Sequence, residues 1–150
     1  MNKLKTIKGQ SLFEVVVALG VVTMIIVAII ILATNSIRNT TYSRNKTLSS
    51  RYAQEAVEWL RNEREKGNSA FLLNIAVPIY CFDNLSWTNA GVCDADETIA
   101  GTILKREAYF STSLLSGKNI VEAVVVVSWD DSQGYHEVRN TTNFTDTREK

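Results

Sequence analysis

The residue best placed to do chemistry in this chain of 150 residues is a carboxylate, Glu14, at the start of a long apolar run. Residues 15–33 read VVVALGVVTMIIVAIIILA and carry no charged side chain, with only Gly20 and Thr23 to dilute them. An ionised carboxylate inside a bilayer costs about 2.5–3.5 kcal/mol unless it is paired. Glu14 therefore predicts a cationic partner at its own depth in the membrane.

A cut in front of this segment creates such a cation. Cleavage after Gly9 frees the α-amino group of Gln10, about one helical turn before Glu14. A neighbouring helix that is shifted along its axis can bring its own amine against Glu14, and burial makes that pairing selective. The other interpretation is that Glu14 reaches the cytoplasmic interface and meets water there.

The apolar run itself predicts a membrane-spanning helix. Residues 15–33 extend over roughly 28 Å as a helix, close to the hydrocarbon thickness of about 30 Å. Lys3, Lys5 and Lys8 precede the run, with no acidic residue among them, which favours a cytoplasmic N-terminus. An ordinary secretory signal is excluded because the run is too long and lacks an A-x-A cleavage site.

Residues 9–14, GQSLFE, followed directly by the apolar helix, resemble the processing motif of type IV prepilins and of the pseudopilins of type II secretion and DNA-uptake machines. The resemblance implies that a prepilin peptidase cuts after Gly9 and methylates Gln10. It also implies that Glu14 pairs with the N-terminus of a neighbouring subunit during assembly. The commonest residue after the cut in that family is phenylalanine, and this chain has Gln10 there.

The function implied is that of a minor pilin or pseudopilin, a structural subunit rather than an enzyme. Its expected partners are other pilin subunits, the prepilin peptidase and, before assembly, membrane lipid. The subunit is expected in the cytoplasmic membrane with its N-terminus inside, and then in an extracellular or periplasmic filament. The competing hypothesis is an uncleaved, signal-anchored membrane protein whose outer domain binds a ligand or protein.

Cys81 and Cys93 are the only cysteines. In an exported domain they favour a disulfide, and in a cytosolic domain two free thiols. Nearby, the acidic side chains of Asp94, Asp96 and Glu97 could ligate calcium, although such a cluster is more often a solvated turn. No other metal site and no cofactor are predicted.

Signals for catalysis and nucleic-acid binding are missing from the sequence. The chain has 16 basic and 16 acidic residues, so no global charge attracts nucleic acid. It contains no HExxH, GxSxG or glycine-rich phosphate motif. The single histidine, His136, lies in a predicted strand and is more often a surface or packing residue than a base.

The expected fold class is α+β, with a long N-terminal helix packed on a small antiparallel sheet, as in the α/β roll of pilins. We expect a leader at 1–9, a transmembrane and assembly helix at 10–33 and its amphipathic continuation at 34–67. A globular domain is expected at 68–150. If the helix is continuous it runs from Leu12 to Lys66, and Gly67 ends it. One stripe of its amphipathic part is predicted from three- and four-residue steps to comprise Leu48, Tyr52, Ala56, Trp59, Leu60 and Glu63, with charged residues on the other side.

Residues 68–100 lack periodicity and predict an irregular excursion. Three strands are predicted after it: one around 104–110, one over 120–129 and one over 135–144. Residues 116–119 are expected to break the first strand from the second, and a five-residue turn, 130–134, to join the second to the third. The inward faces of the last two strands are predicted as Val121, Ala123, Val125, Val127 and Trp129, and as His136, Val138, Asn140, Thr142 and Phe144.

Overall fold

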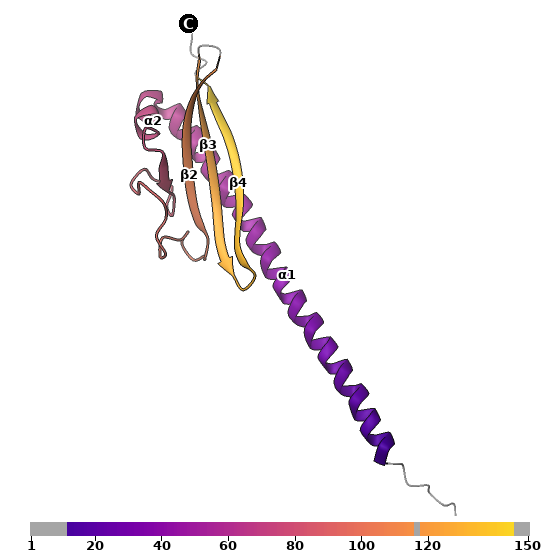
Figure 1. Ribbon diagram of the computed structural model, residues 1–150. Coiled ribbons are helices and arrows are strands. Elements are labelled where there is room, and N and C mark those ends of the chain that lie inside the picture. Colours follow the sequence, from indigo (N-terminus) through magenta and orange to yellow (C-terminus); the bar gives the residue numbers. More distant parts are fainter. Residues whose placement is uncertain (1–11, 116–117, 146–150) are drawn as a thin grey trace, which may run out of the picture. The chain divides into compact units, whose positions relative to one another are not determined.

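One helix runs through most of the N-terminal half of the chain (Figure 1). The structure, a computed structural model, describes residues 12–115 and 118–145, and helix α1 spans Leu12–Lys66. The chain divides between Ser43 and Arg44 into two compact units, called here the first and second unit. The predicted continuous helix is confirmed. Gly67 follows it in an extended conformation, and Arg64 and Lys66 in its last turn complement the helix dipole.

The second unit combines the last part of α1 with an antiparallel sheet, so the predicted α+β class is confirmed. The sheet has four strands in the order β1-β2-β3-β4, one more than the sequence predicts. Neighbouring strands pair antiparallel throughout. The strands are β1 (Ile79–Cys81), β2 (Lys105–Leu115), β3 (Lys118–Asp131) and β4 (Gly134–Thr145).

The core lies between this sheet and α1. All five predicted inward residues of β3 are at most 4% exposed, which confirms that face. The corresponding face of β4 is half-buried from His136 to Thr142 and fully buried at Phe144. The buried stripe of the helix differs from the predicted one, because only Ala56 and Leu60 are shared. The stripe that the structure buries comprises Ser49, Ala53, Ala56, Val57 and Leu60.

The prediction of an irregular excursion at 68–100 is wrong in its first part. Helix α2 spans Asn68–Asn74, and the short strand β1 follows it. Phe71 and Ile75 are 2% and 7% exposed, so burial against the rest of the second unit holds a segment whose own sequence has no period. The Tyr80 hydroxyl donates to the carbonyl oxygen of Asn74 at 3.0 Å and ties the strand to the helix.

The two predicted breaks between strands are shorter in the structure. Lys118 and Asn119 belong to β3, whereas residues 116–117 lie outside the described part. The turn between β3 and β4 contains only residues 132–133. Gly134 has φ 114°, a conformation that favours glycine, and the carboxylate of Asp131 accepts the backbone N–H of Gln133 at 2.7 Å.

Candidate functional site

The apolar segment of α1 presents lipid-like side chains on every side. Residues 12–41 are all exposed, and the helix contains an 18-residue window of mean hydropathy 3.3 with none of its residues buried. The hydroxyl of Thr23 donates to the carbonyl oxygen of Gly20 at 2.8 Å, so this polar group is satisfied within the helix. In the described part, this is the one helix long and apolar enough to cross a membrane.

Glu14 lies in the first turn of α1 as described, at the end of this apolar surface. Its side chain is exposed, and within residues 12–115 and 118–145 it forms no ion pair. Gly9 and Gln10, the predicted cleavage and terminal residues, lie outside the described part. The roles of all three residues therefore stay predictions.

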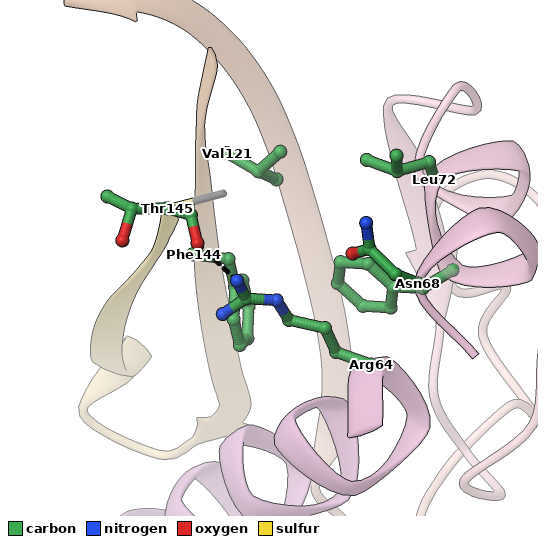
Figure 2. Close-up of a pocket in the computed structure, with 7 residues that line it drawn as sticks. Arg64, Asn68, Leu72, Val121, Phe144 and Thr145 are labelled. Atoms are coloured by element: carbon green, nitrogen blue, oxygen red, sulfur yellow. Dashed lines mark hydrogen bonds between the residues drawn. The ribbon is translucent and has the colours of Figure 1, made fainter. Parts of the chain in front are cut away.

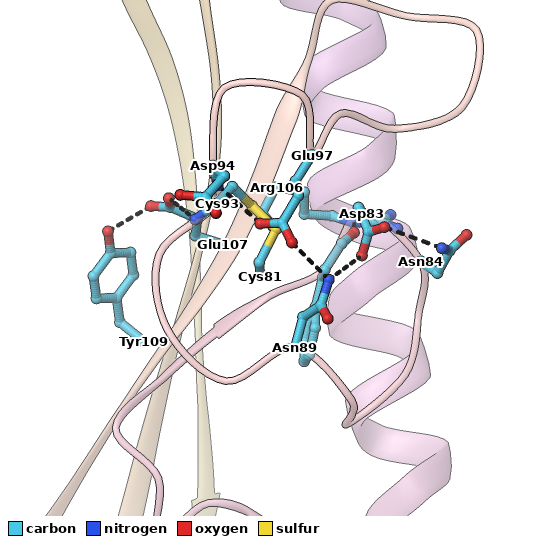
Figure 3. The surroundings of a disulfide bond; sticks show 11 residues. Cys81, Asp83, Asn84, Asn89, Cys93, Asp94, Glu97, Arg106, Glu107 and Tyr109 are labelled. Atoms are coloured by element: carbon cyan, nitrogen blue, oxygen red, sulfur yellow. Dashed lines mark hydrogen bonds between the residues drawn. A yellow bond between two sulfur atoms is a disulfide. The ribbon is translucent and has the colours of Figure 1, made fainter.

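Cys81 and Cys93 form a disulfide at the β1 edge of the sheet (Figure 3). Both residues are buried, at 2% and 9% exposure. The N–H of Cys81 donates to the carbonyl oxygen of Asn89 at 2.9 Å, and the N–H of Cys93 donates to the carboxylate of Glu107 at 2.9 Å. The disulfide prediction is confirmed. The bond makes a closed loop of residues 81–93, called here the excursion, and the hydrogen bond to Glu107 attaches the end of this loop to strand β2.

Inside this closed excursion, Trp87 joins an aromatic cluster. Its ring centroid lies 5.0 Å from that of Trp59 on α1 and 5.1 Å from that of Tyr80 on β1. Its indole N–H donates to the carboxylate of Glu63 at 3.1 Å. The hydrogen bond from Lys66 has the largest effect on the pKa of Glu63 and lowers it. The bond from Trp87 lowers it further, while burial acts in the opposite direction. The excursion is therefore fixed to the helix by packing as well as by its disulfide.

The three candidate calcium ligands are placed differently from one another. Asp94 and Asp96 are exposed, whereas Glu97 is half-buried. One oxygen of Glu97 accepts the side-chain amide of Asn89 at 3.1 Å, and the other accepts the N–H of Asp94 at 2.8 Å (Figure 3). Both oxygens thus already have protein donors that organise the loop. Calcium binding by these residues stays an untested alternative.

A buried arginine, Arg106, is absent from the residues predicted from the sequence. Arg106 on β2 is 3% exposed, and its Nε donates to the carbonyl oxygen of Phe82 at 2.8 Å. Its Nη1 donates to the carbonyl oxygen of Tyr52 at 3.2 Å and to the carboxylate of Glu55 at 3.0 Å. Burial lowers the pKa of Arg106, while Glu55 opposes that shift.

A signal for this arginine was present in the sequence. Ala108 and Phe110 lie on the apolar side of β2, and Leu104, just before the strand, continues their two-residue spacing. Position 106 falls within this series, on the same side. A charged residue at an inward strand position must be paired or hydrogen-bonded when it is buried. Arg106 joins the helix, the excursion and the sheet through the bonds that satisfy it.

His136 also has a structural environment. Its Nε2 lies 3.0 Å from the carboxylate of Asp131, and its ring lies 5.2 Å from the ring of Trp129. The hydrogen bond from the N–H of Gln133 has the largest effect on the pKa of Asp131 and lowers it, and the side chain of His136 also lowers it. The histidine thus belongs to the β3–β4 hairpin, in keeping with the packing interpretation.

A small cavity lies where α1, α2, β3 and β4 meet (Figure 2). Its volume is about 50 Å³. Arg64 lies over the Phe144 ring, with 5.6 Å from its guanidinium carbon to the centroid, and donates to the carbonyl oxygen of Thr145. The lining residues are Arg64, Asn68, Phe71, Leu72, Val121, Phe144 and Thr145. Since ligand pockets usually measure about 300–1,000 Å³, this cavity fits a few water molecules rather than a substrate.

No family model, curated protein or solved structure matches this chain. The features that bear on function are therefore its own: a long, exposed apolar helix and a disulfide-linked unit of helix and four-stranded sheet.

Proposed function

We propose that this chain is a structural subunit of a filament of the type IV pilin class, a minor pilin or a pseudopilin. The observation that carries the proposal is the 55-residue helix α1, which is apolar and exposed at its start and packed on a four-stranded antiparallel sheet at its end. This architecture is consistent with a pilin-like fold.

The exposed apolar surface supports transfer between two environments. A helix that is apolar on all sides is stable only in lipid or among other apolar helices. Lipid holds such a segment before assembly, and the same segments of neighbouring subunits replace lipid in a filament. Because lipid and helix side chains are equally apolar, hydrophobicity alone cannot set the register of neighbouring helices.

Glu14 supplies that register in the proposal. Cleavage after Gly9 leaves the amine of Gln10 in the membrane, and a neighbouring subunit shifted along the helix axis pairs this amine with its own Glu14. Every wrong register leaves a charge unpaired, at about 2.5–3.5 kcal/mol. The pairing thus selects one axial offset between subunits.

The disulfide supports the orientation of the subunit. Basic residues flank the apolar segment on both sides, Lys3, Lys5 and Lys8 before it and Arg38, Arg44 and Lys46 after it, so charge alone does not settle which end stays inside. Disulfides persist in oxidising compartments. A bond between Cys81 and Cys93 favours a second unit outside the cytosol and a leader inside it.

Substitution of Glu14 tests the pairing. Glu14→Gln removes the charge but keeps the size and polarity of the side chain. We expect normal cleavage and membrane insertion, with incorporation into filaments reduced roughly 100-fold, the equivalent of about 2.7 kcal/mol. Glu58→Gln is the matched control, because Glu58 is 67% exposed and pairs only with Arg61 of the same helix among the described residues. Incorporation of Glu14→Gln at the level of the control would refute the pairing.

Gly9→Val separates the proposal from an uncleaved membrane anchor. The filament proposal predicts that this variant accumulates as full-length precursor and does not assemble. An uncleaved anchor predicts that the variant behaves like the wild-type chain in size and location.

A further inference from the structure

Strand β4 presents a long, regular edge. It is the last strand in the sheet order, and in the described part of the chain no strand pairs with its outer side (Figure 1). All twelve of its residues pair with β3 in one register without a bulge. Bulges, prolines and lysines are three of the usual means of protecting an edge, and β4 contains none of these three; its charged residues are Glu137 and Arg139. The carbonyl oxygen of Thr145 accepts from Arg64, and the other backbone N–H and C=O groups that point away from β3 can accept a further strand.

The same edge is where the core meets solvent. On the inner face, Val127 of β3 is 0% exposed, whereas its neighbour Val138 on β4 is only half-buried. On the outer face, Arg139 donates to the carboxylate of Glu137 at 2.7 and 3.2 Å. An added strand therefore gains an apolar contact on one face and charged neighbours on the other.

We propose that the partner of this edge is β4 of a second copy, paired antiparallel about Val138. In this register Val138 lies opposite the same residue of the other copy. Glu137 then lies opposite the other copy's Arg139, and Arg139 lies opposite its Glu137. The charge pattern of the strand is thus complementary to itself.

The charges also exclude the neighbouring registers. Residues opposite each other in an antiparallel pair lie on the same face of the sheet. The two-fold axis can therefore pass only through a residue, and neighbouring registers place it one residue further along the strand. Centring it on residue 137 sets two glutamates against each other, and centring it on residue 139 sets two arginines against each other. Like charges directly opposite destabilise a sheet. The axis at Val138 alone of these three gives two attractive pairs.

This contact is closed and lies outside the proposed filament contact. A two-fold axis uses each β4 edge once, so association stops at a dimer with one sheet of eight strands. The axis also reverses the direction of the strands, whereas successive subunits of a polar filament point the same way. The inference does not depend on cleavage after Gly9 or on Glu14, and its test is separate from theirs.

A single introduced cysteine tests the register in the full-length chain in detergent micelles. Cys81 and Cys93 are bonded to each other, so Val138→Cys adds the one free thiol among the described residues. Opposite residues in an antiparallel pair are about 4.5–5.5 Å apart between Cα atoms, which a disulfide can bridge. We expect a covalent dimer on mild oxidation, visible on a non-reducing gel.

Thr142→Cys is the matched control, because Thr142 is half-buried on the same face of β4. In the proposed register the two copies of residue 142 are eight positions apart, or about 26 Å, beyond the reach of a disulfide. Equal cross-linking of both variants would overturn the register. The absence of cross-linking at position 138 would overturn the contact, provided that the variant shows the wild-type circular dichroism.

Charge exchange gives an independent readout by sedimentation of chains without added cysteine. Arg139→Glu sets like charges opposite each other at two places, and we expect dimerisation to weaken about tenfold. The double variant Glu137→Arg with Arg139→Glu restores both pairs and should restore the dimer. A wild-type chain that sediments as a monomer at every concentration, or a double variant no better than Arg139→Glu, contradicts the proposal.

Discussion

The hydrogen bonds of Arg106 predict a specific destabilisation when its guanidinium is removed. Arg106→Met keeps an unbranched side chain in the 3%-exposed site but loses every donor. The carbonyl oxygen of Phe82 then loses the Nε donor at 2.8 Å. The carbonyl of Tyr52 belongs to helix α1, where the helix ladder supplies another donor. Glu55, whose side chain is 54% exposed, turns to water.

The expected cost follows from the one carbonyl that is left without a partner. A buried acceptor without a donor costs about 1–3 kcal/mol, whereas an ion pair with an exposed carboxylate contributes less than about 1 kcal/mol. For a unit of this size, 1–3 kcal/mol corresponds to a fall in Tm of roughly 5–20 °C. Glu55→Gln removes only the ion pair and should lower Tm by less than about 5 °C.

Thermal unfolding followed by near-ultraviolet circular dichroism measures both variants in the full-length chain in detergent. The signal reports the second unit, because all three tryptophans, Trp59, Trp87 and Trp129, belong to it. A loss for Glu55→Gln as large as that for Arg106→Met would refute the reasoning, since it would assign the stability to the ion pair. An unchanged Tm for Arg106→Met would refute it as well.

Three further predictions concern the second unit. Replacing Cys81 and Cys93 together by alanine should lower the free energy of unfolding by about 3 kcal/mol, because the disulfide closes a loop between residues 12 positions apart. An unchanged denaturant midpoint would contradict this effect of loop closure. Leu60→Ala should cost about 2–5 kcal/mol because Leu60 is 0% exposed, and a Tm within a degree of wild type would show that the helix does not pack on the sheet as described. The hydrogen bond to Glu107, above all, raises the pKa of Tyr109 to about 12, so the folded state favours the neutral phenol. That stabilisation is present below the ordinary pKa of about 10 and is lost as the pH rises from there towards 12. Glu107→Gln should bring the pKa of Tyr109 back towards the ordinary value. The titration of Tyr109 is followed by tyrosinate absorbance, as the part of the signal that the Tyr109→Phe variant lacks. A pKa that stays near 12 in Glu107→Gln would rule out Glu107 as the main cause.

The long elements of the fold could be predicted because their signals are local. The nineteen uncharged residues 15–33 locate the first part of α1. Gly67, after the second helical segment, locates its end. Five apolar residues at alternate positions from Val121 to Trp129 locate the buried face of β3. The disulfide followed from two cysteines in a domain expected outside the cytosol. In these cases the period of the side chains or the chemistry of the residue type determines the answer.

The short elements could not be predicted because their stability comes from residues far away in the sequence. Helix α2 and strand β1 are held by contacts of Phe71 and Tyr80 with the rest of the second unit. The buried stripe of α1 was misplaced since small residues such as Ser49 and Ala53 carry no hydrophobic signal of their own. Arg106 was missed because a charged residue in a strand is normally assigned to solvent.

The mass of the mature protein shows whether the amine that would pair with Glu14 is formed. Intact-mass measurement of the chain purified from membranes of cells with an active prepilin peptidase reads the N-terminus without any substitution. We expect a chain that begins at Gln10, with Glu14 as the fifth residue of the mature protein. A chain that retains Met1 to Gly9 in such cells would contradict it, because no amine would then lie within the membrane to pair with Glu14.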